Sequence, residues 1–135
     1  MKYSLLLVFL LIIGCSKENP TEPSRPIPTV SGKWTGGTIE LSATFDMSEI
    51  NGMIDGSGNF YSDWYNLPAQ PLYCAVSGRH GDSEVTLHFV AITSGITAAD
   101  FVGNLSNGSL ITGKLTGFGR VDSTFFFVRQ TTKPN

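Results

Sequence analysis

The sequence predicts an all-β domain, an antiparallel up-and-down meander of seven or eight strands that forms a small closed or nearly closed barrel. Apolar and polar residues alternate with period two through most of residues 30–130, and tight-turn signals separate the alternating runs. Glycine is frequent throughout, at fifteen residues in the chain. No window carries a sustained apolar stripe at helical spacing. A sandwich of two sheets has the same alternation and stands as the alternative.

Each alternating run marks an expected strand. In the first long run one face carries Ile39, Leu41, Ala43, Phe45 and Met47, with polar residues between them. Later runs cover 85–89, 101–105, 110–111 and 125–128, and their phenylalanines predict a packed core rather than a cavity (Phe45, Phe89, Phe101, Phe125 and Phe127). Turns are expected at 51–52, 55–58, 78–82 and 106–108, where Asn-Gly and Gly-rich sequences favour positive backbone angles.

A weak internal repeat adds to this reading. A small hydroxyl residue, a glycine and a polar residue recur at 31–33, 57–59, 77–79 and 112–114. Glycine weakens a strand unless a bulge, a bend or a close backbone approach requires it. Recurring strand glycines are typical of the sharply coiled sheets that close into small barrels.

The N-terminus is expected to be an export signal. Nine apolar residues, 5–13, follow the charge of Lys2 and end at Gly14-Cys15. At about 1.5 Å per residue this run is too short for a membrane core of about 30 Å, which indicates a signal h-region. Ile12-Ile13-Gly14-Cys15 resembles the lipobox of bacterial lipoproteins. The resemblance implies that residues 1–14 are a signal peptide and that the Cys15 sulfur is acylated; an ordinary secretory signal is the alternative.

Residues 15–29 are expected to be a tether between the lipid and the folded domain. Four of the seven prolines lie here, and such a segment stays extended. Ser16 after the cysteine resembles lipoproteins sent to the outer membrane, and Lys17-Glu18 resembles the charged start used for surface display. The expected location is therefore the outer membrane, on its periplasmic or surface face. Residues 131–135 are expected to form a flexible C-terminal tail after the 30–130 domain.

Charge excludes one class of partner. Loss of Lys2 with the signal leaves eight cationic residues against eleven acidic ones, a net charge of about −3. Nucleic acid binding needs a basic surface, so no nucleic acid partner is expected. Membrane attachment depends on the acyl chains on Cys15, and stable anchoring takes more than one chain.

A search for reactive residues finds no catalytic or metal site. His80 lies in a Gly-rich stretch expected to be a solvated turn, and His88 takes a polar strand position. Asp46 and Glu49 flank a turn and have no paired partner that would mark acid–base catalysis, and residues 55–59 lack the later carboxylate of a calcium loop. The histidines do not have zinc spacing. We expect no enzyme, no metal and no cofactor.

Cys74 alternates with Leu72 and Val76 on the apolar face of an expected strand. It is therefore expected to be a buried, inert thiol. If Cys15 is acylated, Cys74 has no disulfide partner in the chain; a Cys15–Cys74 disulfide is possible only without the lipobox.

Residues 31–34, Ser-Gly-Lys-Trp, resemble the Gly-x-Trp that opens lipocalins, avidins and a family of small bacterial metalloprotease inhibitors. The resemblance implies an up-and-down barrel whose floor is closed by Trp34, with Arg129 packed over the ring as a cation–π partner. The chain departs from these families because it has no Thr-Asp-Tyr motif, a folded part of only about 100 residues (30–130), and no inhibitor-type disulfide. The resemblance therefore concerns shape and no activity.

The stretch 59–68 holds four aromatic residues and is the candidate binding site. Aromatic side chains suit recognition surfaces and barrel mouths. Tyr61, Trp64 and Tyr65 are the expected contacts, and Asp63 and Asn66 would orient the ligand or partner. Alternatively, Trp64 and Tyr65 plug one end of the barrel.

The sequence thus predicts a lipid-anchored envelope protein with a non-catalytic binding or interaction domain. The expected partner is a small apolar or sugar-like ligand, or an envelope protein. A protease-inhibitor-like or purely structural role at the cell surface is the alternative.

Overall fold

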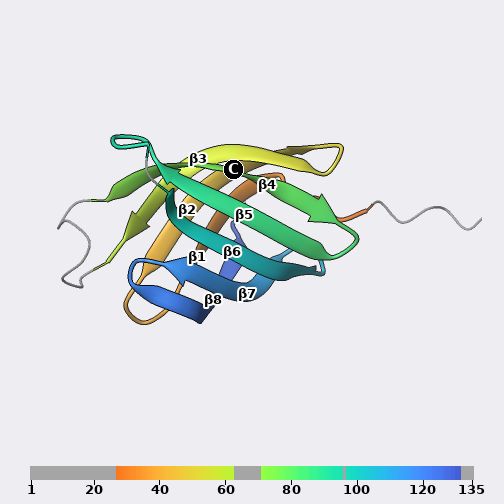
Figure 1. Cartoon of the computed structure of the whole chain (residues 1–135). Helices are drawn as coiled ribbons and strands as arrows, with labels where there is room; N and C mark the ends of the chain where they lie inside the picture. The colour runs from red at the N-terminus through yellow and green to blue at the C-terminus, as the bar shows by residue number, and fades with distance from the viewer. Residues whose placement is uncertain (1–26, 63–70, 96, 132–135) are drawn as a thin grey trace, which may run out of the picture.

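The computed structural model describes residues 27–62, 71–95 and 97–131, in which the regular elements are eight β-strands. Each strand pairs antiparallel with the next, and β8 pairs with β1, so the sheet closes into a barrel (Figure 1). The strands are β1 (Gly32–Gly37), β2 (Ser42–Ile50), β3 (Met53–Tyr61), β4 (Leu72–Gly81), β5 (Glu84–Ala91), β6 (Thr97–Ser106), β7 (Leu110–Gly117) and β8 (Arg120–Arg129). The predicted all-β meander is confirmed, and closure excludes the two-sheet sandwich. No helix in the described part of the chain has the length and apolar character needed to span a membrane.

Because consecutive strands are antiparallel, their connections lie alternately at the two ends of the barrel. The end where β1 begins, here called the entry end, carries the short turns at 51–52, 82–83 and 107–109. The opposite end, here called the rim, carries the connections 38–41, 62–71, 92–96 and 118–119. Figure 1 shows the described N-terminal segment leaving at the entry end, beside the β2–β3 and β4–β5 hairpins.

Two entry-end turns follow the predicted chemistry. Asn51 and Gly52 both have positive φ, at 52° and 74°, as do Asn107 and Gly108, at 52° and 68°. These are the backbone angles that let a tight turn match the twist of its two strands. The Asn-Gly signals at 51–52 and 106–108 therefore predicted real turns.

The interior is filled by the inward-facing residue of each alternating pair. Leu41, Ala43, Phe45 and Met47 are buried as predicted. Ile39 is fully exposed instead, because it lies in the bend at residues 39–40 of the β1–β2 connection, and the inward alternation begins only at Leu41. Six fully buried phenylalanines are in ring contact with one another, with centroids as close as 4.8 Å: Phe45, Phe60, Phe89, Phe101, Phe125 and Phe127. The packed core predicted from five of them is confirmed.

Two of the predicted turns are wrong. Residues 55–58 lie inside β3, and residues 78–81 lie inside β4, whose turn to β5 is only residues 82–83. Three of the glycines in these stretches, Gly56, Gly58 and Gly78, serve close approach between strands. A Cβ atom on Gly58 would lie 2.1 Å from the Thr44 carbonyl oxygen, and one on Gly78 would lie 2.0 Å from the Thr86 carbonyl oxygen. The predicted role of the repeated strand glycines is confirmed at these positions.

Cys74 is fully buried on the inner face of β4, as predicted. Burial raises the pKa of its thiol from 9.0 to about 11. The folded thiol therefore stays protonated at neutral pH, and ionisation above pH 9 favours the unfolded chain, in which the pKa has its ordinary value.

Substitution of Gly58 by alanine tests the close approach. We expect Gly58→Ala to lower the free energy of unfolding by about 1–3 kcal/mol, because the methyl group must displace the backbone of β2. Gly81→Ala is the matched control, since a Cβ atom there meets nothing within 4 Å. Urea unfolding followed by circular dichroism measures both variants. Equal stability of the two variants would contradict the role given to Gly58.

Candidate functional site

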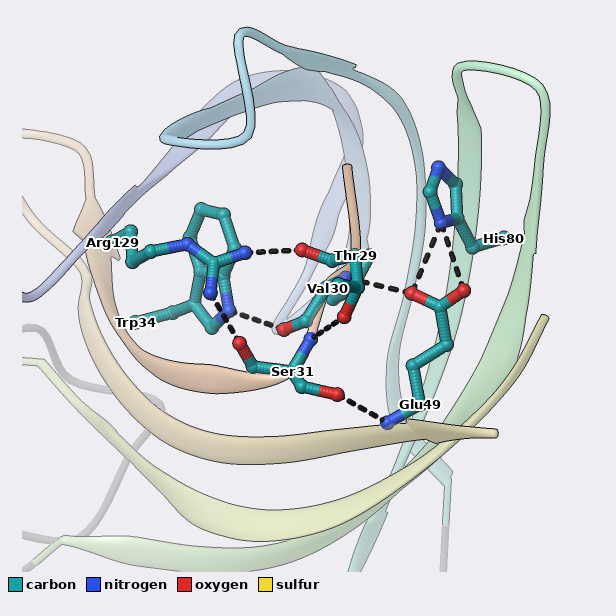
Figure 2. A network of polar contacts seen from close by, with 7 residues as sticks. All are labelled: Thr29, Val30, Ser31, Trp34, Glu49, His80 and Arg129. Atoms are coloured by element: carbon teal, nitrogen blue, oxygen red, sulfur yellow. Dashed lines mark hydrogen bonds and ion pairs between the residues drawn. The ribbon is translucent and has the colours of Figure 1, made fainter. Parts of the chain in front are cut away.

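The entry end is closed by the chain segment that leads into β1. We call Thr29, Val30 and Ser31 the strap, because these residues cross this end of the barrel and are held there by polar contacts (Figure 2). Val30 is completely buried and belongs to the core cluster. The strap is thus the plug of the entry end and also the point at which the upstream chain joins the domain.

Arg129, at the end of β8, holds the strap from one side. Its guanidinium donates to the carbonyl oxygens of Thr29 and Ser31, and its Nε donates to the Gly108 carbonyl at 2.6 Å. The Cζ atom of Arg129 also lies 4.6 Å from the centroid of the Trp34 ring. The cation–π pair implied by the lipocalin resemblance is confirmed. Trp34 completes the contact, because its indole N–H donates to the Val30 carbonyl at 2.7 Å.

Glu49, near the end of β2, holds the strap from the other side. Its carboxylate accepts the Val30 backbone N–H at 2.6 Å, and its own N–H donates to the Ser31 hydroxyl at 2.8 Å. The same carboxylate lies 3.0 Å from His80 Nδ1. One sequence expectation is wrong here, because His80 is buried and is not in a solvated turn.

The position of His80 follows from the alternation of β4. Cys74, Val76, Gly78 and His80 take successive inward positions, so the His80 side chain is only 3 % exposed. Its Nε2 atom is buried and has no hydrogen-bond partner among the described residues. An ionised carboxylate only accepts hydrogen bonds, so the contact with Glu49 places the proton on Nδ1. Glu49 thereby connects the strap to β4.

The rim has a different character. Five large apolar or aromatic side chains that are exposed lie on or next to its connections: Ile39, Tyr61, Tyr73, Ile92 and Val121. Below them Phe118 packs on Phe60, with ring centroids 4.9 Å apart. An ion pair between Arg120 and Glu40 joins the start of β8 to the β1–β2 connection. The rim is therefore a partly apolar surface above a filled barrel, and an ion pair connects two of its segments.

Tyr61 is the one predicted site residue that the structure describes, and it is exposed at the rim end of β3. Asp63, Trp64, Tyr65 and Asn66 lie outside the described residues, as does the lipidation candidate Cys15. The connection that contains the first four leaves the barrel after Ser62, whose hydroxyl donates to the Glu40 carbonyl at 2.8 Å, and returns at Pro71. Both of its ends are therefore at the rim.

His88 lies on the outer wall, as the sequence predicted, and is half exposed. Its Nδ1 atom lies 2.5 Å from Asp100 Oδ1 on the neighbouring strand. In the described ranges no group of three or more histidine, cysteine or acidic residues could hold a metal ion.

Comparisons of the chain with protein-family models, with curated proteins and with solved structures found no match. The fold and the two barrel ends must therefore be interpreted from their own geometry. That geometry is a small eight-stranded antiparallel barrel, compatible with the lipocalin and avidin shape, closed by a strap at one end and partly apolar at the other.

Replacement of Arg129 by lysine tests how the strap is held. Lysine keeps the charge but loses the planar fork that reaches three carbonyl oxygens, so we expect Arg129→Lys to lower the free energy of unfolding by about 2 kcal/mol. The same change at Arg79, on the outer wall, is the control and should alter stability by less than about 0.5 kcal/mol. Urea unfolding measures both. Similar losses for the two variants would show that Arg129 is no special support.

Proposed function

We propose that this protein is a lipid-anchored lipoprotein of the bacterial outer membrane whose barrel is a non-catalytic binding or interaction module. The observation that carries the proposal is the difference between the two barrel ends: the chain enters at one end, and the other carries five exposed large apolar or aromatic side chains and the long 62–71 connection, whereas Ile27, Ile50 and Met53 are the exposed large apolar side chains at the entry end. With acyl chains on Cys15, residues 15–29 lead from the membrane to the strap. The rim is then the end of the domain directed away from its attachment.

The strap supports this use of the N-terminus. Arg129, Trp34 and Glu49 hold its backbone from three different strands. A pull on the tether is therefore passed to β1, β2 and β8 together rather than to one strand end. Such an attachment suits a domain that is held at a membrane through a single chain segment.

The filled interior favours one kind of partner. A small ligand taken into the barrel needs an open lumen, and here six phenylalanines occupy the interior. The surface available to a partner at the rim is formed by Tyr61, Tyr73 and the neighbouring apolar residues. Exposed aromatic and aliphatic side chains of this kind are typical contact residues between proteins. We therefore favour another envelope protein over a small apolar or sugar-like ligand.

Metabolic labelling with an alkyne fatty acid tests the anchor. The wild-type chain and Cys74→Ser should carry the label and fractionate with outer membranes, because only Cys15 follows the lipobox. Cys15→Ser should lose the label and the membrane association. Labelling of Cys15→Ser, or an unlabelled wild-type chain, would overturn the lipoprotein assignment and leave the barrel analysis intact.

Photo-crosslinking in living cells tests the rim. A benzoylphenylalanine at Tyr73, on the rim, should form an adduct with a defined envelope protein, and the same probe at Ser48, on the exposed outer wall of β2, should not. The yield of this crosslinked adduct should fall at least about fivefold in Trp64→Ala, since an aromatic anchor contributes about 2 kcal/mol or more.

Native mass spectrometry of the same protein tests the alternative of a small-molecule ligand. A small-molecule adduct that is lost in Trp64→Ala would identify a ligand instead of a protein partner. No adduct of either kind would contradict a binding role.

A further inference from the structure

The outer wall of β3, β4, β5 and β6 carries a groove of about 420 Å³ that runs across the strands. Its floor is the strip of backbone at four paired residues, Ile54, Gly78, Leu87 and Phe101. The strand register places one row of outward side chains on each side of this floor. One row, here called the cationic row, is Met53, Arg79, Thr86 and Val102; the other, here called the acidic row, is Asp55, Ser77, His88 and Asp100.

The two rows have opposite charge. Arg79 is the cation of the first row, and Asp55 and Asp100 are the anions of the second. Asp100 pairs with His88, whereas neither Arg79 nor Asp55 makes an ion pair in the described part of the chain. Met53 and Val102, at the two ends of the cationic row, are 54 % and 52 % exposed. The face thus combines unpaired charges of both signs with exposed apolar side chains.

We propose that this face binds a second copy of the chain. A surface can associate with itself across a two-fold axis only if the axis brings complementary groups together. An axis that runs along the groove, parallel to the outer face, lays the cationic row of one copy over the acidic row of the other. Arg79 of each copy then faces Ser77 of the other copy, with Asp55 next in the row and within reach of its long side chain. The interaction occurs twice, once on each side of the axis.

The same arrangement covers the exposed apolar side chains. Met53 and Val102 lie at opposite ends of a row that spans four strands, about 14 Å at the usual strand spacing of about 4.8 Å. The axis places Met53 opposite Asp55 of the other copy and Val102 opposite Asp100, so association removes part of each apolar side chain from water. Two convex barrel walls touch over a limited area, so we infer a weak dimer in the small, transient size class. The rim stays free in this arrangement, because the groove lies on the wall.

Sedimentation velocity of the full-length protein in a mild detergent tests the proposal, together with charge exchange. We expect a monomer–dimer equilibrium in the micromolar range, weakened about tenfold or more by Arg79→Asp and likewise by Asp55→Arg. The double variant should return to within about threefold of wild type, because the exchanged charges pair again across the axis. Asp46→Arg is the matched control, since Asp46 is an exposed acid on the outer face of β2, outside the groove. Far-ultraviolet circular dichroism establishes that each variant keeps the fold.

Any of the following three outcomes overturns the proposed dimer. A wild-type chain that stays monomeric up to about 1 mM has no such interface. A dimer unchanged by both single variants, or weakened equally by Asp46→Arg, uses another surface. Loss in both single variants without recovery in the double variant rules out the pairing of Arg79 with Asp55. None of these results bears on lipidation or on the rim, which are tested separately.

Discussion

The pairing of β1 with β8 makes this sheet a barrel, and Arg129 secures that closure. Four residues of β1 face four of β8, with Trp34 directly opposite Arg129. The guanidinium of Arg129 then extends past the sheet to the strap and to the β6–β7 turn. A single side chain therefore connects the first strand, the last strand and the segment that plugs the entry end. Without this closure, β1 and β8 would be open edges with unpaired backbone groups.

Closure at this size decides where a partner can bind. Eight strands enclose a volume that side chains can fill, and here phenylalanine rings from five strands fill it. Function is therefore expected on the outside of the barrel, at the rim or on the wall. The rim has exposed apolar residues and the longer connections, whereas the wall has charged rows set by strand register. The two surfaces lie apart, so a contact on one leaves the other accessible.

The fold was largely predictable from local sequence, and the polar contacts were not. Alternation identified Leu41, Ala43, Phe45 and Met47 as core residues, and it failed for Ile39, which precedes the paired part of β2. Glycine was ambiguous, because it serves both turns and close strand approach. This ambiguity placed His80 in a turn. Counting inward positions from Cys74 along β4 would have placed it in the core, but the partner carboxylate of Glu49 lies 31 residues away in sequence.

The sequence by itself determined the all-β class, the strand alternation, the Asn-Gly turns and the pairing of Trp34 with Arg129 through a family resemblance. These depend on short periods and on single motifs, which are local properties of the chain. Only the tertiary structure decided that the sheet closes, that Glu49 and His80 hold the strap, and that charged residues line up across four strands. Each of these depends on strand register, which aligns residues distant in sequence and moves every side chain to the other face if it slips by one.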